Sequence, residues 1–165
     1  MPPWPSPARS ADVTGAGDVA TEAAQDRLYA AELSSTFDCV RQTLAEVMVR
    51  LDPKTYGLEE RGTVELVLAE VLNNVVEHAY GGREDGVISL AVNQVGGGLW
   101  IEVRDTGAPM PTGGFPDESP VTAARDLLSV PEGGYGWFLI GQLAHDPCYR
   151  RDGDRNVFSF RLSVG

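Results

Sequence analysis

Residues 64–80, VELVLAEVLNNVVEHAY, constrain this chain more than any other stretch of its sequence. Wound as an α-helix at about 100° per residue, they gather apolar side chains on one broad face and polar side chains on the other. The apolar face carries Val64, Val67, Leu68, Val71, Leu72, Val75 and Ala79, and the polar face carries Glu70, Asn73, Asn74, Glu77 and His78. We therefore expect a helix that packs one side on a hydrophobic core.

Three side chains of the polar face follow one another at steps of four residues. Glu70, Asn74 and His78 are expected to line up within roughly 80° of arc, so a carboxylate, an amide and an imidazole converge. Any half-buried helix needs a polar face, however, so this alignment alone does not separate a binding site from a solvated surface. The segments that follow in the chain decide between the two.

Length and charge limit the possible classes of protein. A chain of 165 residues is long enough for one domain with a full hydrophobic core and too short for two of ordinary size. Its 24 acidic and 13 basic residues give a net charge of −11, which disfavours nonspecific binding to nucleic acid or to an anionic membrane. Cys39 and Cys148 have no metal-ligand spacing and are typical of reduced packing residues.

The composition along the chain predicts a leader and one domain. The first residues are rich in Pro, Ala, Ser and Gly, so we expect residues 1–26 to be a disordered leader and residues 27–165 to form the domain. No apolar run approaches about 18 residues and no signal-peptide pattern is present. We therefore expect a soluble, cytoplasmic protein.

The first half of the domain predicts a strand and two helices. Residues 27–33 favour a short edge strand, although two alanines weaken the pattern. The hydroxyl side chains at 34–36 offer N-caps to a first helix, which stops before Pro53. The second helix covers residues 58–80 and is stopped by two glycines.

After residue 86 the apolar period changes to two, which is typical of strands. Residues 87–92 and 99–103 predict an antiparallel hairpin around a glycine turn at 96–98. About two dozen residues without a strong period follow, 107–132. Loops this long are uncommon in compact domains unless they act as lids or binding segments.

The remaining residues predict one more helix and one more hairpin. The helix follows Gly136, and the hairpin consists of residues 148–151 and 155–163. The order of elements favours an α+β fold in which helices cover one face of a mostly antiparallel sheet.

A carboxylate stands where the strand of residues 99–103 stops. Asp105 is followed by Gly107, which allows a flat ligand to approach the backbone closely. An ionised carboxylate accepts hydrogen bonds from an exocyclic amino group such as that of adenine. An ordinary Asp-Thr-Gly turn explains the same residues, so this segment is not decisive by itself.

Glycines also open the third helix. Gly133, Gly134 and Gly136 let successive backbone N–H groups point at one spot, and the positive end of the helix favours phosphate there. The segment has neither the Lys-Ser or Lys-Thr pair of a P-loop nor the GxGxxG pattern of dinucleotide-binding domains.

Taken together, the three segments resemble the GHKL ATPase superfamily, and within it the bacterial anti-sigma-factor serine/threonine kinases. The motif forms that carry the resemblance are E-x-x-x-N-x-x-x-H-A-Y at 70–80, D-x-G-x-P at 105–109 and G-x-G-x-F-L-I at 134–140. The resemblance covers about residues 33–162. It implies a two-layer α/β sandwich of the Bergerat type that binds ATP and Mg²⁺.

The resemblance also implies roles for the helix residues. Asn74 would be the Mg²⁺ ligand, and Glu70 would be the general base that takes the proton of a substrate hydroxyl. His78 would orient water or phosphate, although a structural histidine fits this position equally well.

The other two motifs would hold the nucleotide. Asp105 would bind the adenine amino group with Gly107 beneath the base, and Gly134 and Gly136 would cradle the phosphates. Residues 107–133 would form the ATP lid. Two departures from the family stand out: the lid has no Lys, which leaves Arg125 as its only cation and phosphate partner, and the Thr or Ser of the last strand is replaced near Asn156.

The function that the resemblance implies is an anti-sigma factor that is also a protein kinase. It would sequester a sigma factor and phosphorylate a STAS-type anti-anti-sigma protein, with homodimerisation through the first strand and helix. A second reading is a non-catalytic regulatory protein that only binds ATP. A histidine kinase is disfavoured because both histidines, His78 and His145, lie inside the ATP domain.

Overall fold

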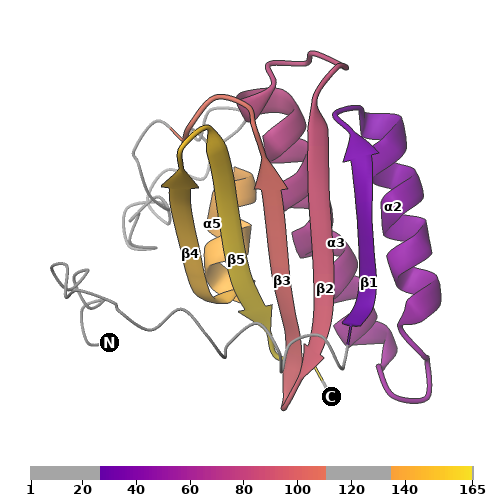
Figure 1. The fold of residues 1–165 in the computed structure, drawn as a ribbon. Helices are drawn as coiled ribbons and strands as arrows, with labels where there is room; N and C mark the ends of the chain where they lie inside the picture. Colours follow the sequence, from indigo (N-terminus) through magenta and orange to yellow (C-terminus); the bar gives the residue numbers. More distant parts are fainter. Residues whose placement is uncertain (1–26, 111–134, 165) are drawn as a thin grey trace, which may run out of the picture.

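Five strands form a single sheet in the computed structural model, which describes residues 27–110 and 135–164. In chain order the elements are β1 (Arg27–Ser34), α2 (Phe37–Arg50), α3 (Leu58–Asn74), η1 (Val75–Ala79), β2 (Val87–Val95), β3 (Gly98–Asp105), α5 (Tyr135–Leu143), β4 (His145–Asp152) and β5 (Arg155–Leu162). The strand order is β1-β2-β3-β5-β4, and each neighbouring pair is antiparallel. Figure 1 shows the three α-helices together on one face of this sheet. The α+β class with helices on one face is confirmed.

The β2–β3 hairpin forms because alternate side chains of both strands are apolar. One set faces the helices and is buried: Ile88, Leu90, Val92, Leu99, Ile101 and Val103. Burying an apolar side chain of this size contributes about 1.5 to 3 kcal/mol relative to leaving it in water. A slip of the register by one residue would turn the whole set to the open face, so the pattern fixes the pairing.

Helix α2 begins where the sequence offers a hydroxyl group. The side chain of Thr36 accepts a hydrogen bond from the backbone N–H of Cys39 at 3.2 Å, and an N-cap bond of this kind is worth about 1 kcal/mol. Val40 and Val47 lie on the inner side of the helix and are buried in the core. The predicted strand over residues 27–33 is confirmed as β1, which pairs with β2 along its length.

The second predicted helix contains a wider turn near its end. Residues 58–74 are α-helical, but Val75–Ala79 form a π-turn, in which the N–H of Tyr80 donates to the carbonyl of Val75 at 3.0 Å. A π-turn needs more residues per revolution than an α-helix, so the helical wheel shifts its phase here. Val76, which lies off the predicted apolar face, is therefore only 1% exposed. The prediction of regular α-helix up to Tyr80 is wrong for this turn.

The last helix and hairpin start earlier than predicted. Helix α5 begins at Tyr135, so Gly136 lies within its first turn and not before it. Strand β4 begins at His145 and not at Cys148, and its pairing with β5 is shifted between these two residues. Pro147 lies in this irregular stretch, where an edge strand tolerates a residue without an N–H group.

The core lies between the helices and the sheet. Its largest fully buried side chains come from both layers, among them Leu68 and Leu72 of α3, Ile140 of α5 and Phe160 of β5. Within the described ranges, no helix is long and apolar enough to cross a membrane. The predicted leader and residues 111–133 of the predicted lid lie outside these ranges.

Candidate functional site

Tyr80 fastens the end of the long helix to the ends of two strands. Its hydroxyl group donates to the carbonyl of Val87 at 2.6 Å and accepts from the N–H of Thr106 at 3.1 Å. Gly86 lies so close that an added Cβ would collide with the Tyr80 ring. The first motif is thereby held at the strand end from which the second motif starts.

Gly107 rests directly on the helix end. An ideal Cβ there would lie 2.5 Å from the carbonyl oxygen of Ala79, and the N–H of Ala108 donates to the same oxygen at 2.7 Å. The two backbones meet because neither residue carries a bulky side chain. The motifs at 70–80 and 105–109 are therefore in direct contact.

Replacing Gly107 by alanine is expected to lower the free energy of unfolding by about 1 to 2 kcal/mol, because the new methyl group must displace main-chain atoms. Those atoms belong to Ala79 and cannot rotate away. Denaturation with urea measures the loss. Gly96→Ala is the matched control, since an added Cβ at Gly96 meets no heavy atom within 4 Å. Equal stability of the two variants would contradict the close contact.

The carboxylate of Asp105 is 7% exposed at the end of β3. It accepts from the N–H of Gly107 at 2.8 Å and from the side-chain amide of Asn156 at 2.7 Å, and both hydrogen bonds end on Oδ1. No residue in the described part of the chain donates to Oδ2. The protein thus fixes one oxygen and leaves the other as an acceptor for a ligand.

Burial raises the pKa of the Asp105 carboxyl above its usual range, because the charged form loses solvation. The hydrogen bonds from Asn156 and Gly107 and the charge of Arg151 lower the pKa, but they do not cancel the effect of burial. An acid whose pKa is raised on folding stabilises the fold below its ordinary pKa, and this contribution is lost as pH rises through the raised value. Ionised Asp105 therefore reduces stability at neutral pH, as is common for carboxylates at functional sites.

Sequence analysis does not identify all the side chains that hold this carboxylate. Asn156 is noted only as the place where the last strand departs from the family pattern. Tyr149 and Arg151 belong to none of the three motifs. The missing signal is the strand order, because β5 lies beside β3 and pairs Asn156 directly with Asp105. Neither the neighbour nor the register of the last strand follows from a linear motif.

Glu70 and Asn74 lie one turn apart on α3, at the place where α5 begins. An added Cβ at Gly136 would collide with Oε2 of Glu70 and would lie 3.5 Å from Nδ2 of Asn74. Gly136 therefore lets the first turn of α5 approach both side chains. The structure brings these three predicted site residues together.

The amide nitrogen of Asn74 and the carboxylate of Glu70 have no hydrogen-bond partners among the described residues. Asn74 is 7% exposed, and its Nδ2 has no hydrogen-bond partner in the described part of the chain. A buried polar group without a partner costs about 1 to 3 kcal/mol, so this amide favours a ligand beside it. Glu70 is half-buried, and its carboxylate makes no hydrogen bond or ion pair with any described residue.

His78 differs from these two residues. It is exposed and lies within the π-turn, so a step of four residues from Asn74 does not return it to the line of Glu70 and Asn74. Its role stays a prediction. Gly134 and Arg125 fall outside the described residues, and their predicted contacts with phosphate stay predictions as well.

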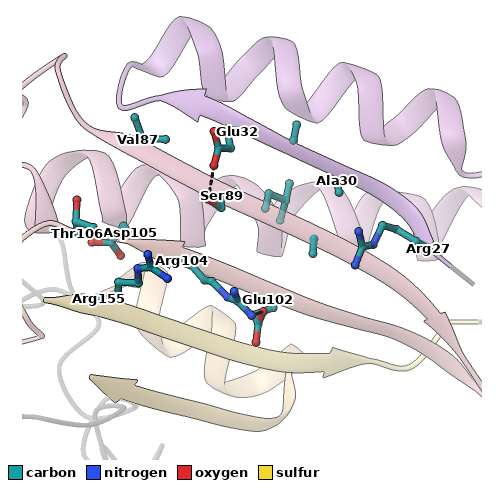
Figure 2. A pocket seen from close by; sticks show the side chains of 13 residues that line it. Arg27, Ala30, Glu32, Val87, Ser89, Glu102, Arg104, Asp105, Thr106 and Arg155 are labelled. Atoms are coloured by element: carbon teal, nitrogen blue, oxygen red, sulfur yellow. Dashed lines mark hydrogen bonds and ion pairs between the residues drawn. The ribbon is translucent and has the colours of Figure 1, made fainter. Parts of the chain in front are cut away.

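A hollow of about 600 Å³ lies on the open face of the sheet, away from α3 and α5. Figure 2 shows side chains of β1, β2, β3 and β5 around it, with the hydroxyl group of Ser89 donating to Glu32 at 3.5 Å. Asp105 and Thr106 also line it, at the end of β3. Glu70, Asn74 and Gly136 do not line it, so Asp105 is the one described site residue that the hollow reaches.

The five-stranded antiparallel sheet with helices on one face is consistent with a GHKL-type ATPase domain. The chain belongs to the family described as the histidine kinase-like ATPase domain, whose family model matches residues 6–162. The resemblance to the GHKL superfamily is confirmed. Domains of this type bind ATP, typically with Mg²⁺, which suggests ATP-dependent phosphotransfer or ATP hydrolysis. No curated protein matches the chain.

The residues present fit ATP and Mg²⁺. The buried Nδ2 of Asn74 has no partner among the described residues and suits a phosphate oxygen. Oδ1 of the same amide is the atom that would bind Mg²⁺, which commonly takes one or two protein oxygens together with phosphate oxygens and water. Asp105 offers an acceptor oxygen to the adenine amino group. Gly107 and Gly136 let the second and third motifs lie against Ala79 and Glu70 of the first, where an added Cβ would collide.

Proposed function

We propose that the chain is an ATP-dependent serine/threonine protein kinase that also acts as an anti-sigma factor. In this proposal it phosphorylates a STAS-type anti-anti-sigma protein and sequesters a sigma factor, in a partner-switching pathway. Membership of the ATPase family supports the use of ATP. The motif forms at 70–80, 105–109 and 134–140, which resemble those of bacterial anti-sigma-factor kinases, support the rest.

The position of Glu70 carries the kinase part of the proposal. A domain that only holds a nucleotide needs Asn74 and Asp105, but it needs no further carboxylate. Glu70 nevertheless lies one turn from Asn74, against the start of α5, and no described residue engages it. A carboxylate in this position is suited to accept a proton beside the metal ligand.

The proposed reaction forms one bond and breaks one bond at phosphorus. The oxygen of the substrate hydroxyl group bonds to the γ-phosphorus, and the bond from that phosphorus to the β–γ bridging oxygen breaks, which releases ADP. Glu70 takes the hydroxyl proton. Asn74 would hold Mg²⁺, which neutralises charge on the phosphates when bound.

The remaining site residues would bind the nucleotide. Asp105 would accept from the adenine amino group through Oδ2, and Gly107 would lie beneath the base. The first turn of α5, with Gly136, would offer backbone N–H groups to the phosphates. Gly134, Arg125 and His78 keep in this proposal the roles that the resemblance implies.

A second copy of the chain is a further proposed partner, through β1 and α2. The position of β1 at the edge of the sheet supports this interface, and α2 beside it exposes Phe37 (51%) and Val49 (82%). The unpaired backbone groups of an edge strand can pair with a strand of another chain. Analytical ultracentrifugation of the full chain measures whether it dimerises.

The kinase proposal is tested with purified protein, ATP labelled on the γ-phosphate, and a STAS protein captured from the native host. We expect label on a Ser or Thr of the STAS protein, located by mass spectrometry. If ATP binds normally but no STAS protein from the host is ever labelled, the chain is instead a non-catalytic ATP-binding regulator that sequesters a partner. If ATP does not bind, both functions are wrong.

A further inference from the structure

We infer that Tyr149, Arg151 and Asn156 set the nucleobase preference of the proposed ATP site by fixing the orientation of Asp105. We call these three side chains the hairpin clamp, because they all belong to the β4–β5 hairpin, which lies beside β3 (Figure 1). The inference rests on the proposed function, in which Asp105 binds adenine. The clamp residues act through Asp105 and the chain that follows it, so they are positioning residues.

The neighbours of Asn156 leave its amide a single orientation. On one side, Nη1 of Arg151 donates to Oδ1 of Asn156 at 2.6 Å, and the hydroxyl group of Tyr149 donates to the same oxygen at 2.7 Å. Arginine can only donate, so the amide oxygen must face it. On the other side, Nδ2 of Asn156 donates to Oδ1 of Asp105 at 2.7 Å and to the carbonyl of Ala108 at 3.1 Å.

This orientation determines which oxygen of Asp105 remains for the base. Asn156 and the N–H of Gly107 both donate to Oδ1 and hold it within the protein. Oδ2 is left as an acceptor without a donor in the described part of the chain. Adenine presents an amino group to such an acceptor, whereas hypoxanthine presents a carbonyl group at the same ring position.

The clamp also holds the main chain after Asp105. Nη1 of Arg151 donates to the carbonyl of Gly107 at 3.2 Å, and the hydroxyl oxygen of Tyr149 accepts from the N–H of Met110 at 3.0 Å. The carboxylate and the backbone of residues 107–110 are therefore fixed by the same three side chains. If Arg151 is lost, Oδ1 of Asn156 keeps only the hydroxyl group of Tyr149 as a donor, and the carbonyl of Gly107 loses its charged partner. Asn156, the carboxylate that it holds and the backbone after Asp105 are then fixed less firmly.

The experiment compares the affinity of the full chain for ADP and for inosine diphosphate by calorimetry. Arg151→Met is expected to reduce the preference for ADP about tenfold, the scale of a disturbed hydrogen bond to a charged group. Arg151→Lys, which keeps a cationic donor, should retain most of the preference. Tyr149→Phe, which removes only the hydroxyl group, should reduce it in the same direction.

Arg150→Met is the matched control, because Arg150 is the next residue of β4 and pairs with Val157 on the opposite face of the sheet. It removes the same charge and should leave the preference unchanged. Melting temperatures without nucleotide show whether each variant folds.

Three results would overturn the inference, and they can be told apart. If the wild-type chain binds ADP and inosine diphosphate equally, the role of Asp105 in the proposed function fails together with the clamp. If the wild type prefers ADP and both Arg151→Met and Tyr149→Phe keep that preference, only the clamp fails. If the variants lose affinity for both nucleotides by the same factor, the three residues have a structural role only.

Discussion

Replacing Glu70 by glutamine is expected to slow phosphate transfer roughly 10²- to 10⁴-fold while ATP still binds. Glutamine has nearly the same shape as glutamate but does not accept a proton at neutral pH. The fold should not change, because no described residue forms a hydrogen bond or ion pair with the Glu70 carboxylate. The measurements are the single-turnover transfer rate to the STAS protein and the ATP affinity by calorimetry.

Two further variants make this result specific. Glu65→Gln is the matched control, because Glu65 lies on the same helix and is exposed; it should transfer phosphate at the wild-type rate. Asn74→Ala should behave differently from Glu70→Gln, since it removes the proposed metal ligand and with it Mg²⁺-dependent nucleotide binding. A Glu70→Gln variant that transfers phosphate as fast as the wild type would show that Glu70 is not the base.

Replacing Asp105 by asparagine is expected to weaken ATP binding by about 1 to 3 kcal/mol, the scale for a lost hydrogen bond to a charged group. Asparagine can still accept at Oδ1 from Gly107 and Asn156, but it places an amide N–H group where Oδ2 would face the adenine amino group. The same substitution should not lower the melting temperature at neutral pH. It removes a carboxylate whose pKa burial raises, and which therefore costs stability when ionised.

This combination of weaker binding and undiminished stability distinguishes a binding residue from a structural one. Asp154→Asn is the control, because Asp154 is exposed in the turn between β4 and β5; it should change neither quantity. Calorimetry with ATP and GTP measures the base preference, and thermal denaturation measures stability. Equal affinity of the wild type for ATP and GTP would overturn the assignment of Asp105, and a large drop in the melting temperature of Asp105→Asn would make its role structural.

The fold could be predicted from the sequence where the signal lies within a single strand or helix. Alternating apolar residues in β2 and β3, the hydroxyl N-cap at Thr36 and the apolar face of α3 are local signals, and each is borne out by burial or by a hydrogen bond. The resemblance implies that Asn74 and Gly136 both act near the phosphates, but it states no contact between the first and third motifs. That contact is visible only in the structure, where Gly136 lets α5 approach Glu70 and Asn74.

Features that depend on two distant segments could not be predicted in the same way. The role of Asn156 follows from its pairing with Asp105 across β3 and β5, and a linear motif contains no information on that register. The π-turn at Val75–Ala79 directly precedes Tyr80, whose hydrogen-bond partners Val87 and Thr106 lie in later segments of the chain. A helical wheel assumes one phase from end to end, so it places His78 and Val76 wrongly with respect to the turn before them.

The π-turn sets the rotational angle between the two halves of the helix. Residues up to Asn74 present their polar side to α5, whereas the residues from Val75 onward are oriented by the hydrogen bonds of Tyr80 to Val87 and Thr106. The number of residues between Asn74 and Tyr80 therefore sets the angle between the proposed metal ligand and the strand end that carries Asp105. Because the N–H of Tyr80 bonds five residues back and not four, the turn holds one residue more than an α-turn. Deleting that residue would leave an ordinary α-turn, whereas inserting another would carry Tyr80 round by about 100° relative to Asn74 and so separate the two parts of the nucleotide site.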